Sequence, residues 1–273
     1  MKHTSVNYAT RSFRIYVLLV TLGLVGIGGA AAQGSSAAAL HPWRAHIRDA
    51  AAYAAQRAGT VSFGVRTRRG LRGVGVKRTV PSASVVKAML LVAYLRRPDV
   101  RGRRLRPDER ALLGPMIRRS DNSAASQVCN IVGTGGLARL ARHAHMRRFR
   151  ATRPWGLTTI DVADQTRFLL HIDRQLPARH RRYALRLLGS IVTSQRWGIA
   201  RVRPRGWALY FKGGWGSGTG WVDHQVALLR RGRRRLSVAI LVTSSPSHAY
   251  GIETLRGVAA RVLRGLGPRS RPR

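Results

Sequence analysis

Three residue types are scarce in this 273-residue chain: cysteine, lysine and glutamate. The one cysteine, Cys129, excludes a disulfide bond within the chain, so the fold must depend on a hydrophobic core. Cys129 lies in an apolar run, which favours a buried side chain over a nucleophile. Of the 50 basic residues four are lysines, and of the 10 acidic residues two are glutamates. A bias toward arginine explains this ratio but not which lysines remain.

Residues 1–32 have the layout of a secretory signal peptide, with a basic start, an apolar run over 15–27 and small residues over 28–32. We therefore expect export, with the protein secreted or held in the cell envelope. An uncleaved membrane anchor is the alternative, because the apolar run approaches the minimum length for spanning a bilayer. Residues 33–40 are expected to form a linker, and residues 41–273 the folded domain.

The formal net charge is +40, yet 44% of the residues are hydrophobic, which excludes a disordered basic tail. A charge of this size favours anionic partners. An exported chain meets wall polymers and anionic lipid, so we expect no nucleic-acid partner. The arginine-rich run over 230–235 lies between two expected strands, where it could bind such a polymer or form a solvated hairpin tip.

Hydrophobic periodicity places strands near both ends of the expected domain and helices between them. Strands are expected over 60–68, 73–80, 207–212, 221–229 and 236–243. Helices are expected over 43–57, 84–96, 106–118, 123–132, 137–145, 159–173, 177–193 and 248–266. Strands from both ends can form one antiparallel sheet flanked by helices, with an inserted all-helical subdomain. The sequence therefore predicts an α+β fold.

The helix expected from Ser84 is apolar on every side apart from Lys87, and such a helix belongs in a core. Lys87 follows Ser84 by one turn on the same helix face. Burial lowers the pKa of a lysine amine, so Lys87 could act as a base where an arginine could not. A helix-capping serine followed by a lysine that reaches solvent is the alternative.

Two further segments carry polar groups at breaks in the chain. Ser120-Asp121-Asn122 interrupts two expected helices and can present a hydroxyl and an amide to a cleft, or simply cap the next helix. Lys212-Gly213-Gly214-Trp215 ends an apolar strand, where glycine allows close approach of a substrate and Lys212 supplies a fixed cation. A glycine-rich hairpin is the alternative. A phosphate-binding loop is not indicated, because its lysine follows the glycines and begins a helix.

In this order, Ser-x-x-Lys, Ser-Asp-Asn and Lys-x-Gly form the three-part signature of penicillin-recognising serine enzymes. Over about residues 43–266 the chain resembles the superfamily of class A β-lactamases and penicillin-binding proteins. The resemblance implies that Ser84 is the acylated nucleophile and that Lys87 helps to remove its proton. It also implies that Ser120 relays a proton to the leaving nitrogen and that Lys212 polarises Ser120.

The same resemblance implies how substrate is held. Asn122 is expected to bind the substrate amide, and Lys212 to steer the substrate carboxylate. The backbone NH groups of Ser84 and Trp215 are expected to form the oxyanion hole, with Gly214 as a neighbouring substrate-binding residue. No cofactor and no metal ion are implied. Asp121 is expected to order its loop.

Two departures from the family pattern limit what the resemblance implies. Family members usually have Thr or Ser where this chain has Gly213, so one hydroxyl contact to the substrate carboxylate is missing, and Ser217, Thr219 or an arginine could replace it. Four tryptophans lie near this motif in the sequence, where they could line the cleft or pack in the core: Trp197, Trp207, Trp215 and Trp221.

The second departure concerns the glutamate that activates the deacylating water in class A β-lactamases. Glu109 and Glu253 are the glutamates of this chain, and neither lies between the second and third motifs. Asp161 and Asp164 are the nearest acids in the sequence, but they fall inside an expected helix. We therefore expect acylation to rely on Lys87 as base and any turnover of β-lactams to be slow.

Other catalytic classes are poorly supported. A Ser/His/Asp hydrolase with a nucleophile elbow is not indicated, because no Gly-x-Ser-x-Gly occurs. A helical metal pair is not indicated either, because His143 and His145 are two residues apart and are expected to point to different helix faces. We expect an exported, monomeric serine acyl-hydrolase or acyl-transferase that forms a Ser84 acyl-enzyme with β-lactams or with acyl-D-alanyl peptides of the cell wall. A protein of the same fold that binds wall material or an anionic polymer without hydrolysis is the alternative.

Overall fold

The computed structural model describes residues 42–217 and 221–266. The expected signal segment over 1–32 and the linker over 33–40 lie outside the described residues, so their expectations stay predictions. Among the helices of the described part, none is long and apolar enough to cross a membrane.

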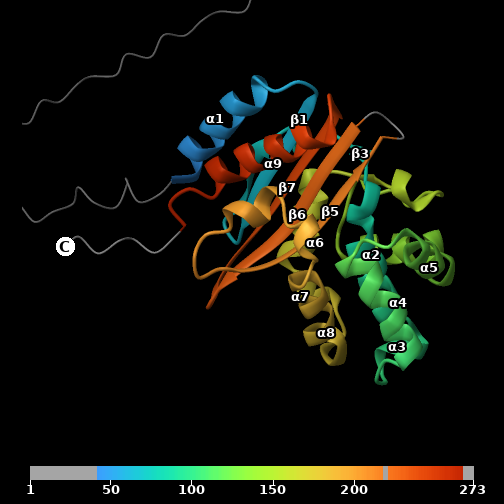
Figure 1. The fold of residues 1–273 in the computed structure, drawn as a ribbon. Helices are drawn as coiled ribbons and strands as arrows, with labels where there is room; N and C mark the ends of the chain where they lie inside the picture. Colours follow the sequence, from blue (N-terminus) through green and yellow to red (C-terminus); the bar gives the residue numbers. More distant parts are fainter. Residues whose placement is uncertain (1–41, 218–220, 267–273) are drawn as a thin grey trace, which may run out of the picture. The chain divides into compact units, whose positions relative to one another are not determined.

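The centre of the fold is a five-stranded antiparallel sheet with the strand order β2-β1-β7-β6-β5. Its strands are β1 (Thr60–Thr67), β2 (Gly70–Val74), β5 (Ala208–Gly216), β6 (Trp221–Arg231) and β7 (Arg234–Ser245). β1 pairs with β7, so strands that lie far apart in the sequence are neighbours in the sheet. The predicted α+β fold with one antiparallel sheet is therefore confirmed, and Figure 1 shows this sheet with helices around it.

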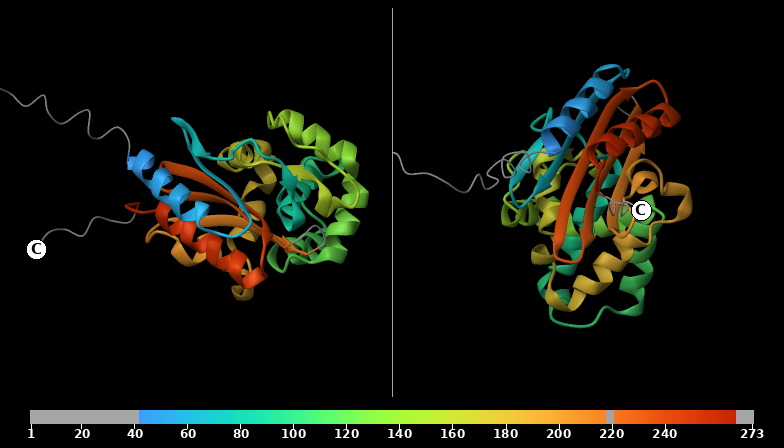
Figure 2. Two further views of the ribbon diagram at one scale, coloured as in Figure 1. Left: turned by 90° about the horizontal axis from the view of Figure 1, so that it is seen from above. Right: turned by 90° about the vertical axis from the view of Figure 1, so that its left-hand side faces the viewer.

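Helices cover both faces of the sheet. On one face α1 (Pro42–Ala55) and α9 (His248–Val262) lie side by side, and α9 packs on β6 and β7, as Figure 2 shows. On the other face α6 (Val162–Leu170) packs on β1 and β7. This cover on both faces explains why the residues along the central strands β6 and β7 are buried almost continuously rather than alternately.

The helical subdomain forms around α2 (Val86–Leu95), in which every residue is buried. Its other elements are α3 (Pro98–Arg101), α4 (Pro107–Arg118), α5 (Asn122–His143), α7 (Ile172–Gln175) and α8 (Ala178–Gly189). Cys129 on α5 is buried with 2% exposure, as predicted. Short 3₁₀ turns connect these elements: η2 (Ala83–Val85), η3 (Trp155–Leu157), η4 (Thr193–Gln195) and η5 (Gly198–Val202).

Two expected elements differ from the structure. The strand expected over 73–80 lies earlier, as β2, because Gly75 has a φ of 59° and ends it. Val80–Pro81 instead forms β3, which pairs with β4 (Thr159–Ile160) in a separate two-stranded sheet. The helix expected over 159–173 begins only after Asp161, whose carboxylate caps α6, and it ends at Leu170. The break expected between the helices over 123–132 and 137–145 is present, because Gly133 within α5 has non-helical φ 67° and ψ 166°.

Candidate active site

Ser84 lies on η2, immediately before the buried helix α2, at the floor of a cleft. The residue before it, Ala83, has a φ of 42°, a conformation that costs a non-glycine residue energy and is found where the surrounding structure enforces it. Hydrogen bonds hold this turn: the Ser82 NH donates to Thr158 O (2.8 Å) and the Val85 NH donates to Ser82 O (3.1 Å). The Ser84 side chain therefore projects from a fixed backbone.

Lys87 lies on α2, one helical turn after Ser84, and is completely buried. Its Nζ donates to Ser120 O (2.5 Å), to Ser120 Oγ (3.2 Å) and to Asn122 Oδ1 (2.7 Å). Burial lowers the pKa of the Lys87 amine from 10.5 to about 7, and the charge of Asp121 opposes this effect only in part. Lys87 thus combines a lowered pKa with a fixed position between the first two motifs.

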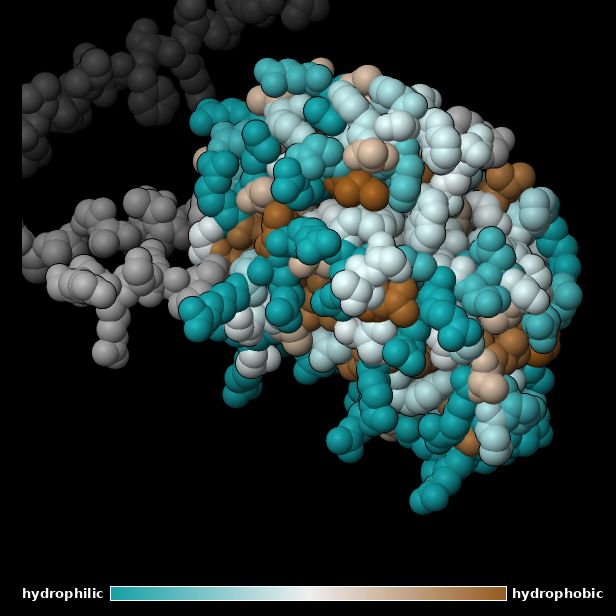
Figure 3. All heavy atoms as spheres, in the orientation of Figure 1, coloured by the Kyte–Doolittle hydropathy of each residue, from teal (hydrophilic) through white to brown (hydrophobic). Residues whose placement is uncertain are grey.

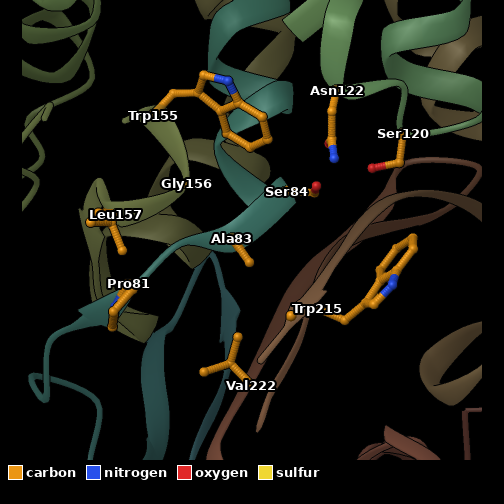
Figure 4. Close-up of a pocket in the computed structure, with 11 residues that line it drawn as sticks. Pro81, Ala83, Ser84, Ser120, Asn122, Trp155, Gly156, Leu157, Trp215 and Val222 are labelled. Atoms are coloured by element: carbon orange, nitrogen blue, oxygen red, sulfur yellow. The ribbon is translucent and has the colours of Figure 1, made fainter. Parts of the chain in front are cut away.

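Ser120 connects the two buried lysines. Its Oγ accepts from Lys212 Nζ at 2.9 Å as well as from Lys87. Ser120 has a φ of 59°, which turns its hydroxyl toward Ser84 in Figure 4. The turn is fixed by Asp121, whose carboxylate accepts from the Ala124 NH (2.8 Å) and caps α5. This hydrogen bond supports the expected role of Asp121 in ordering its loop.

Lys212 on β5 is also completely buried. Its Nζ donates to Gly213 O (2.8 Å) in addition to Ser120. Burial and the nearby charge of Lys87 both lower the pKa of Lys212 well below its ordinary value. Two amines with lowered pKa values thus share one serine hydroxyl.

The two glycines after Lys212 are required by close packing. A Cβ on Gly214 would lie 2.8 Å from the backbone N of Ser84 and 2.8 Å from that of Val85, so only glycine lets β5 approach the nucleophile turn. A Cβ on Gly213 would lie 3.0 Å from the indole of Trp197. The place where relatives are expected to carry a hydroxyl is therefore occupied by an aromatic ring.

The cleft above Ser84 has a volume of about 280 Å³. Polar groups enter it from Ser84, Ser120 and Asn122, and Figure 4 shows their side chains pointing toward one another. The rest of the lining is apolar or glycine and comes from four separate segments: Pro81, Ala83, Trp155, Gly156, Leu157, Trp215, Gly216 and Val222. The structure thus brings together all seven residues that the sequence analysis selected, including Lys87 and Lys212 beneath the cleft.

Comparison with known proteins agrees with this geometry. The family model of the β-lactamase enzyme family matches residues 103–266, more than half of the chain. The chain belongs to the β-lactamase enzyme family. The comparison with curated proteins found no match.

Solved structures of β-lactamases share this fold. A β-lactamase from Sphaerobacter thermophilus has a TM-score of 0.69 at 20% identity, covering 81% of this chain and 96% of that one. An ancestral class A β-lactamase has a TM-score of 0.70 at 19% identity, covering 80% and 98%. A protein named PBP-A has a TM-score of 0.68 at 18% identity, covering 81% and 95%. At these identities the likeness establishes the fold.

The acids of this β-lactamase-family chain do not line the described cleft. All 10 acidic residues lie in the described part of the chain. Glu109 is buried and bonded to Arg103, and Glu253 pairs with Arg256 on α9. Asp161 pairs with Arg148, and Asp164 accepts from two backbone NH groups of the loop before it. Among the described lining residues of the cleft none is acidic.

The sequence analysis missed Trp155, which lines the cleft from η3. Its ring lies 4.7 Å from Lys87 Nζ, and its Nε1 donates to Ser126 Oγ (3.1 Å). No motif surrounds Trp155, so only the spatial packing of η3 against the nucleophile turn reveals it. Of the four tryptophans near the third motif, Trp197 and Trp215 pack together, whereas Trp207 is buried elsewhere with its Nε1 bonded to Leu266 O.

No cluster of three or more His, Cys, Asp or Glu side chains that could hold a metal ion occurs within residues 42–217 and 221–266. The arginine-rich run forms the turn between β6 and β7, where Arg231, Arg233 and Arg234 are exposed. Arg235 at its end pairs with Asp173 (2.9 Å). Figure 3 shows that hydrophilic side chains cover much of one face of the molecule.

Proposed function

We propose that this protein is a serine acyl-hydrolase or acyl-transferase that forms an acyl-enzyme on Ser84 with β-lactams or with acyl-D-alanyl peptides. The observation that carries the proposal is the Ser120 hydroxyl, bonded to both buried lysines and directed toward Ser84. This arrangement provides a nucleophile, a base and a proton path in one cleft.

In the first half of the proposed reaction Lys87 is the base and Ser120 the proton relay. Ser84 Oγ attacks the substrate carbonyl carbon and forms an ester bond, while its proton passes to the neutral amine of Lys87. A pKa near 7 makes that neutral form available at neutral pH. Lys87 Nζ and Ser120 Oγ are 3.2 Å apart, so the proton can continue through Ser120 to the leaving nitrogen as its bond to carbon breaks.

Groups at the cleft floor can stabilise the negative charge that develops on the substrate carbonyl oxygen. The backbone NH groups of Ser84 and Trp215 are our candidates for the oxyanion hole, and the close packing of Gly214 on the Ser84 turn supports their proximity. Lys212 lies 2.9 Å from Ser120 Oγ, where the hydrogen bond that it donates favours an alkoxide-like Ser120. Asn122, bonded to Lys87 through its Oδ1, keeps its amide NH₂ for a substrate carbonyl.

The second half of the reaction lacks a carboxylate. No acid belongs to the described cleft lining, so water attack on the ester has no carboxylate base there. We therefore propose that the acyl-enzyme persists and that its hydrolysis, or its transfer to an amine, is slow.

We also propose that the protein acts outside the cytoplasm. The signal-like composition of residues 1–32 and the net charge of +40 support export and contact with anionic wall polymer or lipid. The protein should be retained on such a polymer through the exposed arginines of the β6–β7 turn, and this retention should weaken as salt rises from 50 to 500 mM. Salt-independent or absent retention would contradict this part of the proposal.

Intact mass over time is the direct test of the acyl-enzyme. The mature protein is incubated with a penicillin beside Ser84→Ala and beside Ser123→Ala, which removes an exposed hydroxyl in the first turn of α5. We expect a single adduct of the penicillin's mass in the wild type and in Ser123→Ala, lasting minutes or longer, and none in Ser84→Ala.

Other outcomes separate the alternatives. Product without a measurable adduct would show that another group takes over deacylation. An adduct in Ser84→Ala would contradict Ser84 as the nucleophile. Neither adduct nor product with β-lactams and acyl-D-alanyl peptides would favour a protein that binds wall material without hydrolysis.

A further inference from the structure

Behind the wall of the cleft lies a polar pair that the proposed reaction does not use. Asp223 on β6 is completely buried, and its Oδ1 is 2.6 Å from Nδ1 of His248, the first residue of α9. A Cβ on Gly251, one turn along α9, would lie 2.0 Å from Asp223 Oδ2, so glycine at this position lets the helix cover the carboxylate. Burying a carboxylate is costly unless it is paired, and His248 is the partner that the structure gives to Asp223.

The His248 ring connects this pair to the cleft. It stacks on the indole of Trp215 with ring centres 5.8 Å apart and an interplanar angle of 27°. Trp215 lines the cleft, and its neighbour across the sheet is Asp223 itself. One carboxylate therefore orients the imidazole, and the imidazole fixes one face of a cleft-lining ring.

Trp197 completes the cluster. Its ring meets Trp215 edge-on at 5.8 Å and 80°, and meets His248 edge-on at 5.7 Å and 87°. Trp197 also covers Gly213, the position next to Lys212 in the third motif. The cluster occupies the place of the hydroxyl that Gly213 lacks, so the wall at this end of the cleft is aromatic and its orientation depends on the groups behind it.

We propose that Asp223 and His248 are positioning residues, which hold the Trp215 indole as a wall of the Ser84 cleft beside Lys212. Lys212 Nζ lies 5.9 Å from the centre of the Trp215 ring, so a shift of the indole alters both the cleft wall and the surroundings of this amine. The proposal rests on the proposed function, because its effect on reactivity is read through acylation of Ser84.

The experiment compares disruptive and conservative variants with a chromogenic cephalosporin as the probe. His248→Ala removes the stacked ring, whereas His248→Phe keeps it, and Asp223→Leu removes the hydrogen-bond acceptor, whereas Asp223→Asn keeps one. We expect the disruptive variants to raise the apparent KM for acylation by about two- to tenfold, the range of one aromatic pair, with the maximal acylation rate unchanged within about twofold. The conservative variants should restore the wild-type KM. Glu253→Gln, which breaks an exposed ion pair on the same helix, is the control.

A double-mutant cycle separates positioning from general stability. In a Trp215→Leu background, His248→Ala should have no further effect on KM, because its action passes through Trp215. Additive effects in the two backgrounds would overturn the proposal, and so would a wild-type KM in His248→Ala. Thermal unfolding of each variant identifies any that fails to fold, and the conservative variants then carry the comparison.

Tryptophan fluorescence provides a readout that does not require a reaction. The emission of Trp215, taken as the difference between each protein and its Trp215→Phe counterpart, should change in His248→Ala and stay close to wild type in Glu253→Gln. A fluorescence change without any acylation would support the positioning of Trp215 and reject the proposed function. Acylation at the wild-type KM in all variants, with unchanged Trp215 emission, would reject the positioning and leave the proposed function standing.

Discussion

The pH dependence of acylation is the sharpest test of Lys87 as the base for Ser84. Burial brings the pKa of the Lys87 amine from 10.5 to about 7. At pH 7 about half of the amine is then neutral, whereas an amine with the ordinary pKa is neutral in about one molecule in 3,000. The second-order rate constant of acylation should therefore rise about tenfold per pH unit below pH 7 and level off above it.

Two variants test the cause of this profile, measured from pH 5 to 9 with a chromogenic cephalosporin. Lys87→Arg retains a cation that cannot lose its proton, so acylation should fall by at least about 100-fold at every pH. Asp121→Asn keeps a residue that caps α5 equally well, but removes the charge that raises the pKa of Lys87. Its midpoint should therefore move to lower pH. A flat profile in the wild type, a midpoint near 10, or an upward shift in Asp121→Asn would refute the reasoning.

Three further predictions concern groups beneath and beside the cleft. The pKa of Lys87 is lower in the folded protein than in the unfolded chain, so the free energy of unfolding should rise from pH 7 to 10 by up to about 1.4 kcal/mol per pH unit for this group. Lys87→Met should reduce this rise, measured by denaturant unfolding at several pH values. Gly213→Thr should lower the free energy of unfolding by about 1–3 kcal/mol without faster acylation, because its Cβ meets Trp197; an unchanged melting temperature would contradict this. Gly214→Ala should slow acylation by about 100-fold while the fold is retained by circular dichroism, since its Cβ meets the backbone of Ser84 at 2.8 Å.

Hydrophobic periodicity predicts the helices and strands that bury one long apolar stripe or one long run of residues. The strands β6 and β7 and the helices α2, α4 and α9 are of this kind, and their positions match the expected ranges within a few residues. The two-residue ladder between β3 and β4 has no period to detect, because it depends on pairing between Val80 and Ile160. The early position of β2 has a similar cause: Gly73 pairs with Gly64 so closely that a Cβ would lie 2.0 Å from Phe63 O.

Sequence order could identify the three motifs because each is short and carries its chemistry in consecutive residues. Their roles as base, relay and cation remain predictions that the close contacts of Lys87, Ser120 and Lys212 support. Trp155 and His248 could not be found in this way. Their relation to the cleft exists only after η3 packs on the nucleophile turn and α9 packs on β6.

The scarcity of acids in this chain links two properties of the cleft that could otherwise be treated separately. A carboxylate close to Lys87 would raise the pKa of its amine by charge attraction, as Asp121 already does to a small extent. With no acid in the described cleft lining, burial dominates and brings the pKa of the amine to about 7, so that about half of it is neutral at pH 7 and available as the proposed base for Ser84. The same absence removes the group that could activate water against the ester. The proposed acylation by Ser84 and the proposed slow deacylation therefore have one physical origin, and a carboxylate that accelerated the second step would weaken the base for the first.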